Sequence, residues 1–551
     1  MRFHPDEKLK CLLVYPRSQG LTFWDLPKSC AMAGCKTLSP PLGLLTVAAI
    51  LPQHWEFRLL DLNCEPFDEE PWDWADLVCT GGMLPQQAGI VDLIHRGARD
   101  GKFVAVGGPD PSSQPEIYER ASALVLQEGE ITIPLWLDSW REGKPTGVFT
   151  TDDKPDVTKS PIPRYDLVNF DDYLYPGIQI SRGCPFNCEF CDVIELYGRK
   201  PRLKTPEQVV AELESLYRLG YSGQLQIVDD NFVGNPRYVK REILPAVIAW
   251  MESRQYPFYV TAQASIDVAD DEELLALMRA AEFRGLFIGV ETPDPELLRS
   301  TQKPQNLTGS LIDRMHKLYD YGMVVAAGFI LGFDNEKDGI DLPIIRCVED
   351  TEIAVAMVGL LIALPDTQLT RRLRKERRLI GGDGKIDSSE GRYRIDVSNT
   401  VFAGFDQMNS GLNFVTTRDR RRILREYLNV LNTIYAADSY FQRVVRAFRR
   451  IKFKSHYWPR WFEIKRLLRG SAALSARLLF NRETCWPYIR TVAQAIPLGL
   501  RGYVNTMKML AIYVDLKDRL HEVNASIERR SRDLDNGLPA SGLADPARNP
   551  E

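Results

Sequence analysis

The sequence has few of the features that mark secreted or membrane-spanning proteins. Ten cysteines in 551 residues are too few for a disulfide scaffold. No stretch of about 18 uncharged apolar residues occurs, and the charged start MRFHPDEKLK lacks the long apolar core of a signal peptide. The six histidines and the carboxylates form no strong acid–base constellation. We therefore expect a cytoplasmic protein, in a reducing compartment that leaves its thiols free to bind metal.

Length and composition indicate several globular domains. A chain of 551 residues is long enough for about three to five domains of ordinary size, and its 44% hydrophobic and 26% charged residues are globular values. The net charge of −5 conceals an asymmetry, because residues 418–508 hold twenty Lys and Arg against five Asp and Glu. This basic segment either solvates helix faces or has a task different from that of the rest of the chain.

Residues 1–150 are predicted to form a doubly wound α/β domain. Runs with the length and composition of buried parallel strands occupy 9–16, 56–63, 77–82, 103–109 and 123–130, and helical patterns such as 43–53 and 87–101 lie between them. Ligands of such sheets bind beyond the carboxyl ends of the strands. The residues expected at that edge are Asp61, Asn63, Gly81, Gly82, Gly107, Gly108, Pro109, Glu128 and Gly129. The glycines fit tight turns equally well.

A second series of strands is predicted after a proline-containing linker at residues 151–177. The strand candidates are 177–183, 223–231, 257–265, 285–292, 324–333 and 354–365, separated by helices such as 205–220 and 270–285. Six strands at this spacing predict a partial (βα)6 barrel over residues 178–365, with its chemistry at the carboxyl ends of the strands.

The remainder of the chain is expected to lack strands. Long basic amphipathic patterns, for example 419–450, predict a helical C-terminal domain over residues 366–530. The tail at 531–551 is rich in Gly, Pro, Ser and Asp and is expected to be disordered, because it has little to bury.

Cys184, Cys188 and Cys191 form a C-x3-C-x2-C motif. Zinc is disfavoured, because a closed zinc site needs four ligands and no Cys or His occurs in the hundred residues after Cys191. Three thiolates suit a cubane iron–sulfur cluster that keeps one iron open for a substrate or cofactor. The motif follows the first predicted barrel strand, at the end of the barrel where chemistry is expected.

The sequence around these cysteines resembles the radical S-adenosylmethionine (SAM) superfamily. In that family the three cysteines hold a [4Fe–4S] cluster whose fourth iron binds SAM, and the reduced cluster cleaves SAM to give a 5′-deoxyadenosyl radical. Phe190 matches the aromatic residue usual before the last cysteine. The resemblance implies SAM contacts from Asp229, Asp230, Asn231, Gln263 and Glu291, and an adenine contact from segment 328–336, which contains Gly332.

The domain order resembles the cobalamin-binding class of radical SAM enzymes, with segments 39–49, 61–63, 107–109 and 128–130 in the expected order. The resemblance implies cobalamin contacts from Asp61, Asn63, Gly81, Gly107, Gly108 and Glu128, and methylation of an unactivated carbon. Cobalamin domains that ligate cobalt from below use Asp-x-His-x-x-Gly, whereas this chain has asparagine at position 63. Any bound cobalamin is therefore expected to lack a histidine ligand. A domain that has lost cobalamin is the alternative.

Segments 184–213, 228–232, 288–293 and 328–334 resemble the bacterial hopanoid 2-methylases, which act on a membrane triterpenoid. This implies a small-molecule or lipid substrate and an electron donor such as flavodoxin or ferredoxin. Trp458 and Trp461 amid Lys and Arg would suit peripheral contact with the inner face of a membrane. A radical SAM enzyme that rearranges, cyclises or oxidises its substrate stays an alternative. The basic region suggests nucleic acid, but no RNA-binding module is recognisable, so no nucleic-acid partner is expected.

Overall fold

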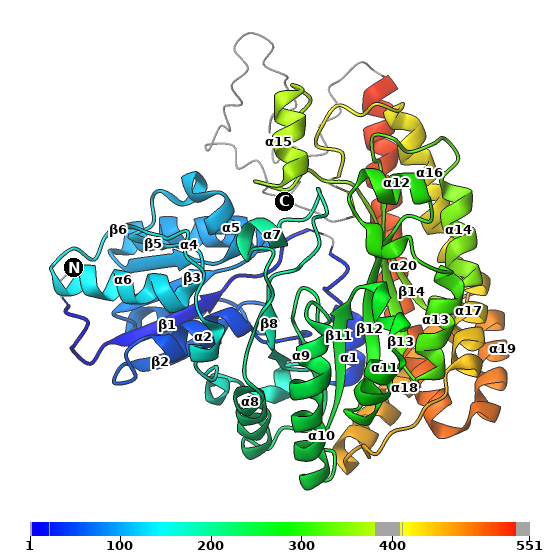
Figure 1. The fold of residues 1–551 in the computed structure, drawn as a ribbon, viewed down its shortest axis with the longest axis horizontal. Helices are drawn as coiled ribbons and strands as arrows, with labels where there is room; N and C mark the ends of the chain where they lie inside the picture. Colours follow the sequence, from blue (N-terminus) through cyan, green and yellow to red (C-terminus); the bar gives the residue numbers. More distant parts are fainter. Residues whose placement is uncertain (1–2, 21, 381–407, 410, 536–551) are drawn as a thin grey trace.

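The computed structural model describes residues 3–20, 22–380, 408–409 and 411–535, and Figure 1 shows its arrangement. An N-terminal α/β domain, blue and cyan in Figure 1, lies beside a green barrel. Helices from the C-terminal third, yellow to red, cover the side of the barrel that faces away from the first domain. The strand directions in the two sheets determine where the carboxyl ends of the strands lie.

The first sheet is parallel throughout and has the order β2-β1-β3-β4-β5-β6. Its strands are β1 (Lys10–Tyr15), β2 (Glu56–Asp61), β3 (Leu77–Gly81), β4 (Phe103–Gly107), β5 (Ala123–Val125) and β6 (Gly147–Phe149). Helices α2 (Leu42–Ile50) and α6 (Gly129–Arg141) pack on one face, and α3 (Glu69–Trp74) and α4 (Gln87–Asp100) on the other. The doubly wound prediction is confirmed. Sequence analysis missed β6, because its three residues are largely exposed and form no apolar run.

The second sheet is also parallel, and its strands follow one another in chain order from β7 to β14. They are β7 (Gly177–Ile178), β10 (Gly223–Ile227), β11 (Phe258–Ala264), β12 (Phe283–Glu291), β13 (Val324–Leu331) and β14 (Val355–Leu360). Outer helices are α8 (Pro206–Arg218), α10 (Leu244–Ser253), α11 (Glu272–Ala280), α13 (Leu311–Asp320) and α14 (Asp341–Asp350), with short α9 (Pro236–Tyr238) and α12 (Pro295–Ser300) at strand ends. Alternate residues of each strand are buried against these helices, and the others face the barrel interior. The six-strand partial barrel is as predicted.

The first barrel strand is shorter than the predicted 177–183. It stops at Ile178, and the chain then forms β8 (Ser181–Arg182), which pairs antiparallel with β9 (Arg202–Leu203). The loop with the cysteine motif and α7 (Val193–Leu196) lie between these two short strands. This hairpin therefore holds both ends of the cysteine loop at the carboxyl end of the barrel.

The C-terminal region is helical, as expected. It contains α15 (Gln368–Lys375), α16 (Arg420–Ile434), α17 (Ala437–Arg450), α18 (Trp461–Leu479), α19 (Cys485–Ala495) and α20 (Gly499–Asp535). Helix α20 continues past residue 531, so the tail begins later than predicted, and 536–551 lie outside the described residues. In the described part of the chain, no helix is both long and apolar enough to cross a membrane.

Helix α1 (Pro27–Ala33) leaves the first domain and packs against α18 and α20. The Asp515 carboxylate accepts hydrogen bonds from the Lys28 and Ser29 backbone N–H groups at 2.9 and 2.7 Å. It also accepts one from the Ser29 hydroxyl. The first domain was predicted to be continuous over residues 1–150, but this segment closes the open side of the barrel instead.

Candidate active site at the carboxyl end of the barrel

The three cysteines of the motif lie on one loop between β8 and α7. Their thiols are free of disulfide bonds. Burial raises the pKa of Cys184, Cys188 and Cys191, and the charges of the other two thiols raise that of Cys191 further. The thiols therefore lie within electrostatic range of one another in a partly dry environment.

Hydrogen bonds around the loop favour the thiolate forms that a metal needs. The Asn231 side chain bonds the Cys184 thiol, and the Gln305 side chain bonds that of Cys188. Backbone N–H groups of the loop contribute in the same direction. Among the described residues, no three Cys, His, Asp or Glu side chains converge as ligands of a single metal ion would.

Asp229 holds the chain that leads into this loop. Its carboxylate is fully buried and accepts hydrogen bonds from the Ile180 N–H at 2.7 Å and the Ser181 hydroxyl at 2.6 Å. Burial raises the pKa of Asp229 to about 6, although both hydrogen bonds act in the opposite direction. Its oxygens are thus engaged by protein, and the side chain fixes the position of β8.

Asp230 and Asn231 lie closer to the thiols. Burial and the charge of Asp229 raise the pKa of Asp230 to about 7, and its carboxylate accepts a long hydrogen bond of 3.4 Å from the Gly183 N–H. The Asn231 carbonyl accepts from the Ser265 N–H at 3.1 Å, which fixes the side chain beside Cys184. These two residues therefore present polar atoms to the space in front of the cysteine loop.

Glu291 forms a buried ion pair with Lys303, whose ammonium lies near Cys188 and Cys191. Both side chains are only about 10% exposed. Glu291 has a positive φ of 63°, a left-handed conformation that is uncommon for glutamate and is found at functional sites. Gly289 leaves room for the pair, because a Cβ there would come within 2.7 Å of Lys303 Nζ.

Phe190 and Gly332 join the cysteine loop to the end of β13. The Phe190 ring packs edge-on against Phe333 with centroids 5.9 Å apart. Gly332 has a φ of 104°, and its N–H donates to the Glu336 carboxylate at 3.1 Å. A Cβ at Gly332 would collide with Leu412, so the glycine permits close approach of the C-terminal region.

Glu128 connects the first domain to the barrel. Its buried carboxylate accepts hydrogen bonds from Arg182 at 2.8 Å and from Arg202 at 2.7 Å. Arg182 also bonds Glu130 at 2.7 Å. These guanidinium groups come from β8 and β9, which flank the cysteine loop, so the carboxyl ends of both sheets meet here.

The other polar residues at the edge of the first sheet also have protein partners. Asp61 accepts hydrogen bonds from the Asn63 side chain at 2.7 Å and the Tyr173 hydroxyl at 3.0 Å. The Asn63 carbonyl accepts from the Ser18 N–H at 3.1 Å. Burial raises the pKa of Asp61, and these bonds act against that rise.

The glycines at this edge let adjacent strands approach closely. A Cβ at Gly81 would lie 2.3 Å from the Gly107 carbonyl oxygen, and one at Gly107 would lie 2.5 Å from that of Val125. Gly108 has a φ of 103° and contacts Gly82. Glycine backbone therefore forms part of this edge, and the side chain of Met83 beside it is 54% exposed.

The barrel interior contains a mainly apolar cavity of about 380 Å³. Gln263 lines it near the carboxyl end of β11, and Phe287, Ala326 and Met357 line it from the next three strands. Segment 23–38 and helices α18 and α20 close its open side. A volume of this size can hold a sizeable apolar molecule.

Comparison with known proteins assigns the family. The profile of the radical SAM superfamily matches residues 178–341, and a domain of unknown function, DUF4070, matches residues 367–529. An uncharacterized methyltransferase of Synechocystis sp. is 43% identical over 80% of this chain and 79% of its own length. The chain belongs to the radical SAM superfamily. A hopanoid C-2 methylase of Rhodopseudomonas palustris is 37% identical, over 63% of this chain and 66% of its own length.

Solved structures show how widely this fold is shared. The cobalamin-dependent SAM radical enzyme OxsB matches 96% of this radical SAM protein and 81% of its own chain, with a TM-score of 0.57 and 15% identity. The methyltransferase TsrM from Kitasatospora setae matches 67% of this chain and 78% of its own, with a TM-score of 0.52 and 16% identity. The predicted fold class is therefore confirmed, including the α/β domain before the barrel.

Family membership accounts for the cysteine loop of this radical SAM protein, because the superfamily binds a [4Fe–4S] cluster and SAM through that motif. Sequence reasoning missed Lys303, which follows α12 outside any recognised motif. The sequence indicated it only by placing a lysine shortly after Glu291 in the chain. The two arginines that bind Glu128 were missed as well, because they are remote from it in sequence.

Proposed function

We propose that this radical SAM protein methylates an unactivated carbon of a large, mainly apolar small molecule or lipid. The apolar barrel cavity is the observation that carries the proposal, because its volume of about 380 Å³ and its mainly apolar lining suit such a molecule. The 37% identity to a hopanoid C-2 methylase supports a polycyclic lipid as the substrate class. Flavodoxin or ferredoxin is the proposed electron donor.

Bound together, the [4Fe–4S] cluster and SAM supply a hydrogen-abstracting adenosyl radical, and cobalamin supplies the methyl group. Cys184, Cys188 and Cys191 would hold the cluster. Asp230, Asn231 and Gln263 would position SAM by hydrogen bonds to its polar groups, and the Glu291–Lys303 pair would fix charge beside the thiolates. The mainly apolar walls of the barrel cavity would limit contact of the substrate with water, which a radical reaction requires.

Cobalamin would lie between the carboxyl ends of the two sheets. Part of the edge there is glycine backbone beside the exposed Met83, and the absence of side chains at the glycines leaves room for a macrocycle. Gly81, Gly107 and Gly108 would lie against it. Asp61, Asn63 and Glu128 would support the cobalamin site without contacting cobalamin directly. Their oxygens already accept hydrogen bonds from Tyr173, Ser18 and the two arginines. Asn63 stands where a histidine ligand would be, so this domain would hold cobalamin without a histidine ligand.

A bilayer surface is the proposed source of the substrate. Several large apolar side chains in residues 458–500 are exposed, including Trp458 at 69%, Phe480 at 92% and Leu500 at 71%. On α18, Trp461, Lys465 and Leu468 share one exposed helical stripe. Mixed apolar and cationic side chains of this kind suit an anionic membrane surface.

Anaerobic reconstitution followed by mass spectrometry tests the reaction class. The loaded full-length protein is incubated with SAM, a reductant and a hopanoid lipid, and both lipid and bound corrinoid are analysed. We expect a lipid product heavier by one methylene unit, together with 5′-deoxyadenosine and S-adenosylhomocysteine. A product of altered structure without that mass gain would overturn the methylation proposal and favour a rearrangement, cyclisation or oxidation.

A further inference from the structure

A second cavity, of about 720 Å³, lies at the opposite end of the barrel from the cysteine loop. Gly223, Tyr259 and Arg284, at the amino ends of β10, β11 and β12, line it. It shares Gln224, Tyr259, Arg284, Asn505 and Lys508 with the apolar cavity described above. The two cavities therefore adjoin each other within the barrel.

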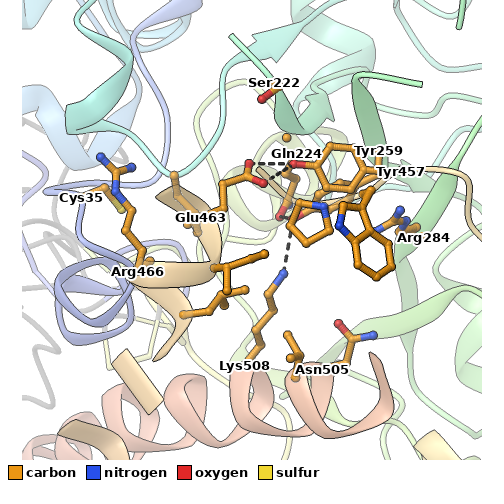
Figure 2. A pocket seen from close by; sticks show the side chains of 18 of the residues that line it. Cys35, Ser222, Gln224, Tyr259, Arg284, Tyr457, Glu463, Arg466, Asn505 and Lys508 are labelled. Carbon is orange, nitrogen blue, oxygen red and sulfur yellow. Dashed lines mark hydrogen bonds between the residues drawn. The ribbon is translucent and has the colours of Figure 1, made fainter. Parts of the chain in front are cut away.

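The chemical character changes along the barrel axis. The upper part is walled by Phe287, Ala326 and Met357. The lower part gathers charged and hydrogen-bonding side chains around one space, as Figure 2 shows. The labelled side chains in that view come from the barrel strands and the residue before β10, from the Tyr457–Arg466 segment, from helix α20 and, for Cys35, from the segment after α1. A ligand that fills both parts must be apolar at one end and polar at the other.

Lys508 carries an unneutralised charge in this lower part. Its ammonium donates to the Tyr259 hydroxyl at 3.4 Å and lies 5.5 Å from that ring's centroid. In the described part of the chain, no carboxylate lies within ion-pair distance of it. Asn505, one turn earlier on α20, projects into the same space, and its side chain has no hydrogen-bond partner among the described residues.

Two more donors in the wall are buried without partners. The Ser222 hydroxyl belongs to a residue that is only 8% exposed, and no described group bonds it. The Nε of Arg284 is likewise unpartnered, although its guanidinium pairs with Glu282 at 3.0 Å and stacks 4.3 Å from the Tyr259 centroid. Buried polar atoms usually have partners, so this cluster points to an absent ligand.

Glu463 supplies acceptors to the same space. Its carboxylate already accepts hydrogen bonds from the Tyr457 hydroxyl at 2.6 Å and the Arg460 N–H at 2.8 Å, and each of its oxygens has more than one acceptor position. Glu463 would repel an anionic group placed directly against it, although Arg284, Arg501 and Lys508 also line the cavity. A hydroxyl group both donates and accepts, so it can bond Lys508 and Asn505 as well as Glu463.

We infer that this lower cavity binds the uncharged, hydroxyl-bearing end of the amphiphilic substrate, whose apolar body lies in the barrel and reaches Gln263. The inference rests on the proposed function, since it assumes that the substrate occupies the barrel. From Tyr259 to Gln263 the extended strand spans about 13 Å. The hydroxyl end would thus act as an anchor that sets which carbon reaches the cysteine-loop end.

Binding of three matched probes to the reconstituted full-length protein tests the anchor. Dodecane-1,2-diol, dodecane and dodecyl phosphate share one apolar chain of suitable length and differ only at one end. We expect the diol to bind tightest to the natural protein. Lys508→Met and Asn505→Leu should each weaken diol binding about tenfold, as the loss of one or two hydrogen bonds implies, and leave dodecane unaffected.

Lys508→Gln and Lys517→Met serve as comparison variants. Glutamine can still bond a hydroxyl, so Lys508→Gln should keep most of the diol preference. Lys517, also on α20, pairs with Glu483 and lies outside both cavities, so its variant should bind all three probes normally. Equal loss of diol and dodecane in Lys508→Met, or tighter binding of dodecyl phosphate than of the diol, would overturn the anchor. The probes report binding alone, so a diol preference without lipid methylation would refute only the proposed reaction.

Discussion

The Glu128 carboxylate, at the carboxyl end of the first sheet, accepts a hydrogen bond of 2.8 Å from Arg182, two residues before the first cysteine of the loop. Arg202, from the strand paired with β8, bonds the other oxygen of the same carboxylate at 2.7 Å. The Glu130 carboxylate accepts a further hydrogen bond from Arg182. Burial alone would raise the pKa of Glu130, but the Arg182 guanidinium lowers it to about 2. The Glu128 and Glu130 carboxylates thus connect the first domain to both ends of the cysteine loop.

Replacing Glu128 by alanine should destabilise the protein and loosen the cluster loop. Arg182 and Arg202 are each less than 15% exposed, and breaking a buried ion pair from one side typically costs about 3–5 kcal/mol. We expect a lower unfolding midpoint in urea and less iron bound after reconstitution. Glu70→Ala is the control, because Glu70 pairs with Arg58 on the surface and should change stability by less than about 1 kcal/mol. Equal urea unfolding midpoints for Glu128→Ala and Glu70→Ala would show that the Glu128 ion pairs do not stabilise the protein.

Each cysteine of the motif should be required for the cluster. Cys184→Ala, Cys188→Ala and Cys191→Ala should each abolish the visible absorbance of the reconstituted cluster and SAM cleavage, since all three cysteines of the motif lie on one loop. Cys485→Ala, on α19, is the matched control and should behave as the natural protein does. SAM cleavage at the natural rate by all three motif variants would show that the cluster lies elsewhere.

Lys303 should raise the reduction potential of the cluster. Although burial opposes its charge, Glu291 and the Cys188 thiolate raise the pKa of Lys303, so a cation lies next to the sulfur ligands. Lys303→Met should therefore shift the cluster potential to more negative values and slow SAM cleavage, with iron content unchanged. A redox titration followed by electron paramagnetic resonance measures the shift. Lys337→Met, which removes an exposed partner of Glu296, is the control, and an identical potential in both variants would refute the role of Lys303.

The strands and the cysteine loop could be predicted because their signals are local. Buried parallel strands appear as continuous apolar runs, and C-x3-C-x2-C is a short motif. The hydrogen-bond partners of individual side chains could not be predicted in this way. Asp229 follows its strand as expected, yet its carboxylate bonds Ile180 and Ser181, which the sequence gives no means to foresee.

Partners that are distant in the chain account for most of what the sequence could not predict. Glu128 was placed correctly at a strand end, but its function depends on Arg182 and Arg202 from the other domain. The closure of the barrel by α1 is similar, since Asp515 binds Ser29 from almost the opposite end of the chain. Such contacts depend on how whole domains pack, which local periodicity does not encode.

Asp229 should make stability fall as the pH rises. Burial raises its pKa from 3.8 to about 6, so between these values the folded state holds a proton that the unfolded state has released. The contribution of Asp229 to the free energy of unfolding is therefore greatest below about pH 4. It decreases by up to about 3 kcal/mol as the pH rises past 6. Asp229→Asn should flatten that slope in urea unfolding of the apo-protein, since its oxygen can still accept from Ile180. The exposed Asp153→Asn should leave the slope unchanged, and an equally steep slope in Asp229→Asn would contradict the assignment.

Membrane binding should depend on both the apolar and the cationic side chains of residues 458–500. Trp461 and Phe480 are 67% and 92% exposed, so inserting them into a lipid interface gains hydrophobic free energy without unfolding anything. The double variant Trp461→Ser, Phe480→Ser should co-sediment at least about tenfold less with phosphatidylglycerol vesicles. Val148→Ser, at an exposed apolar residue of the first domain, is the control and should bind normally.

High salt should weaken binding by the natural protein, because it screens lysine and arginine from the anionic lipid. Equal binding to neutral and anionic vesicles would exclude the electrostatic component, and equal binding by the double variant and the control would place the lipid contact on another surface.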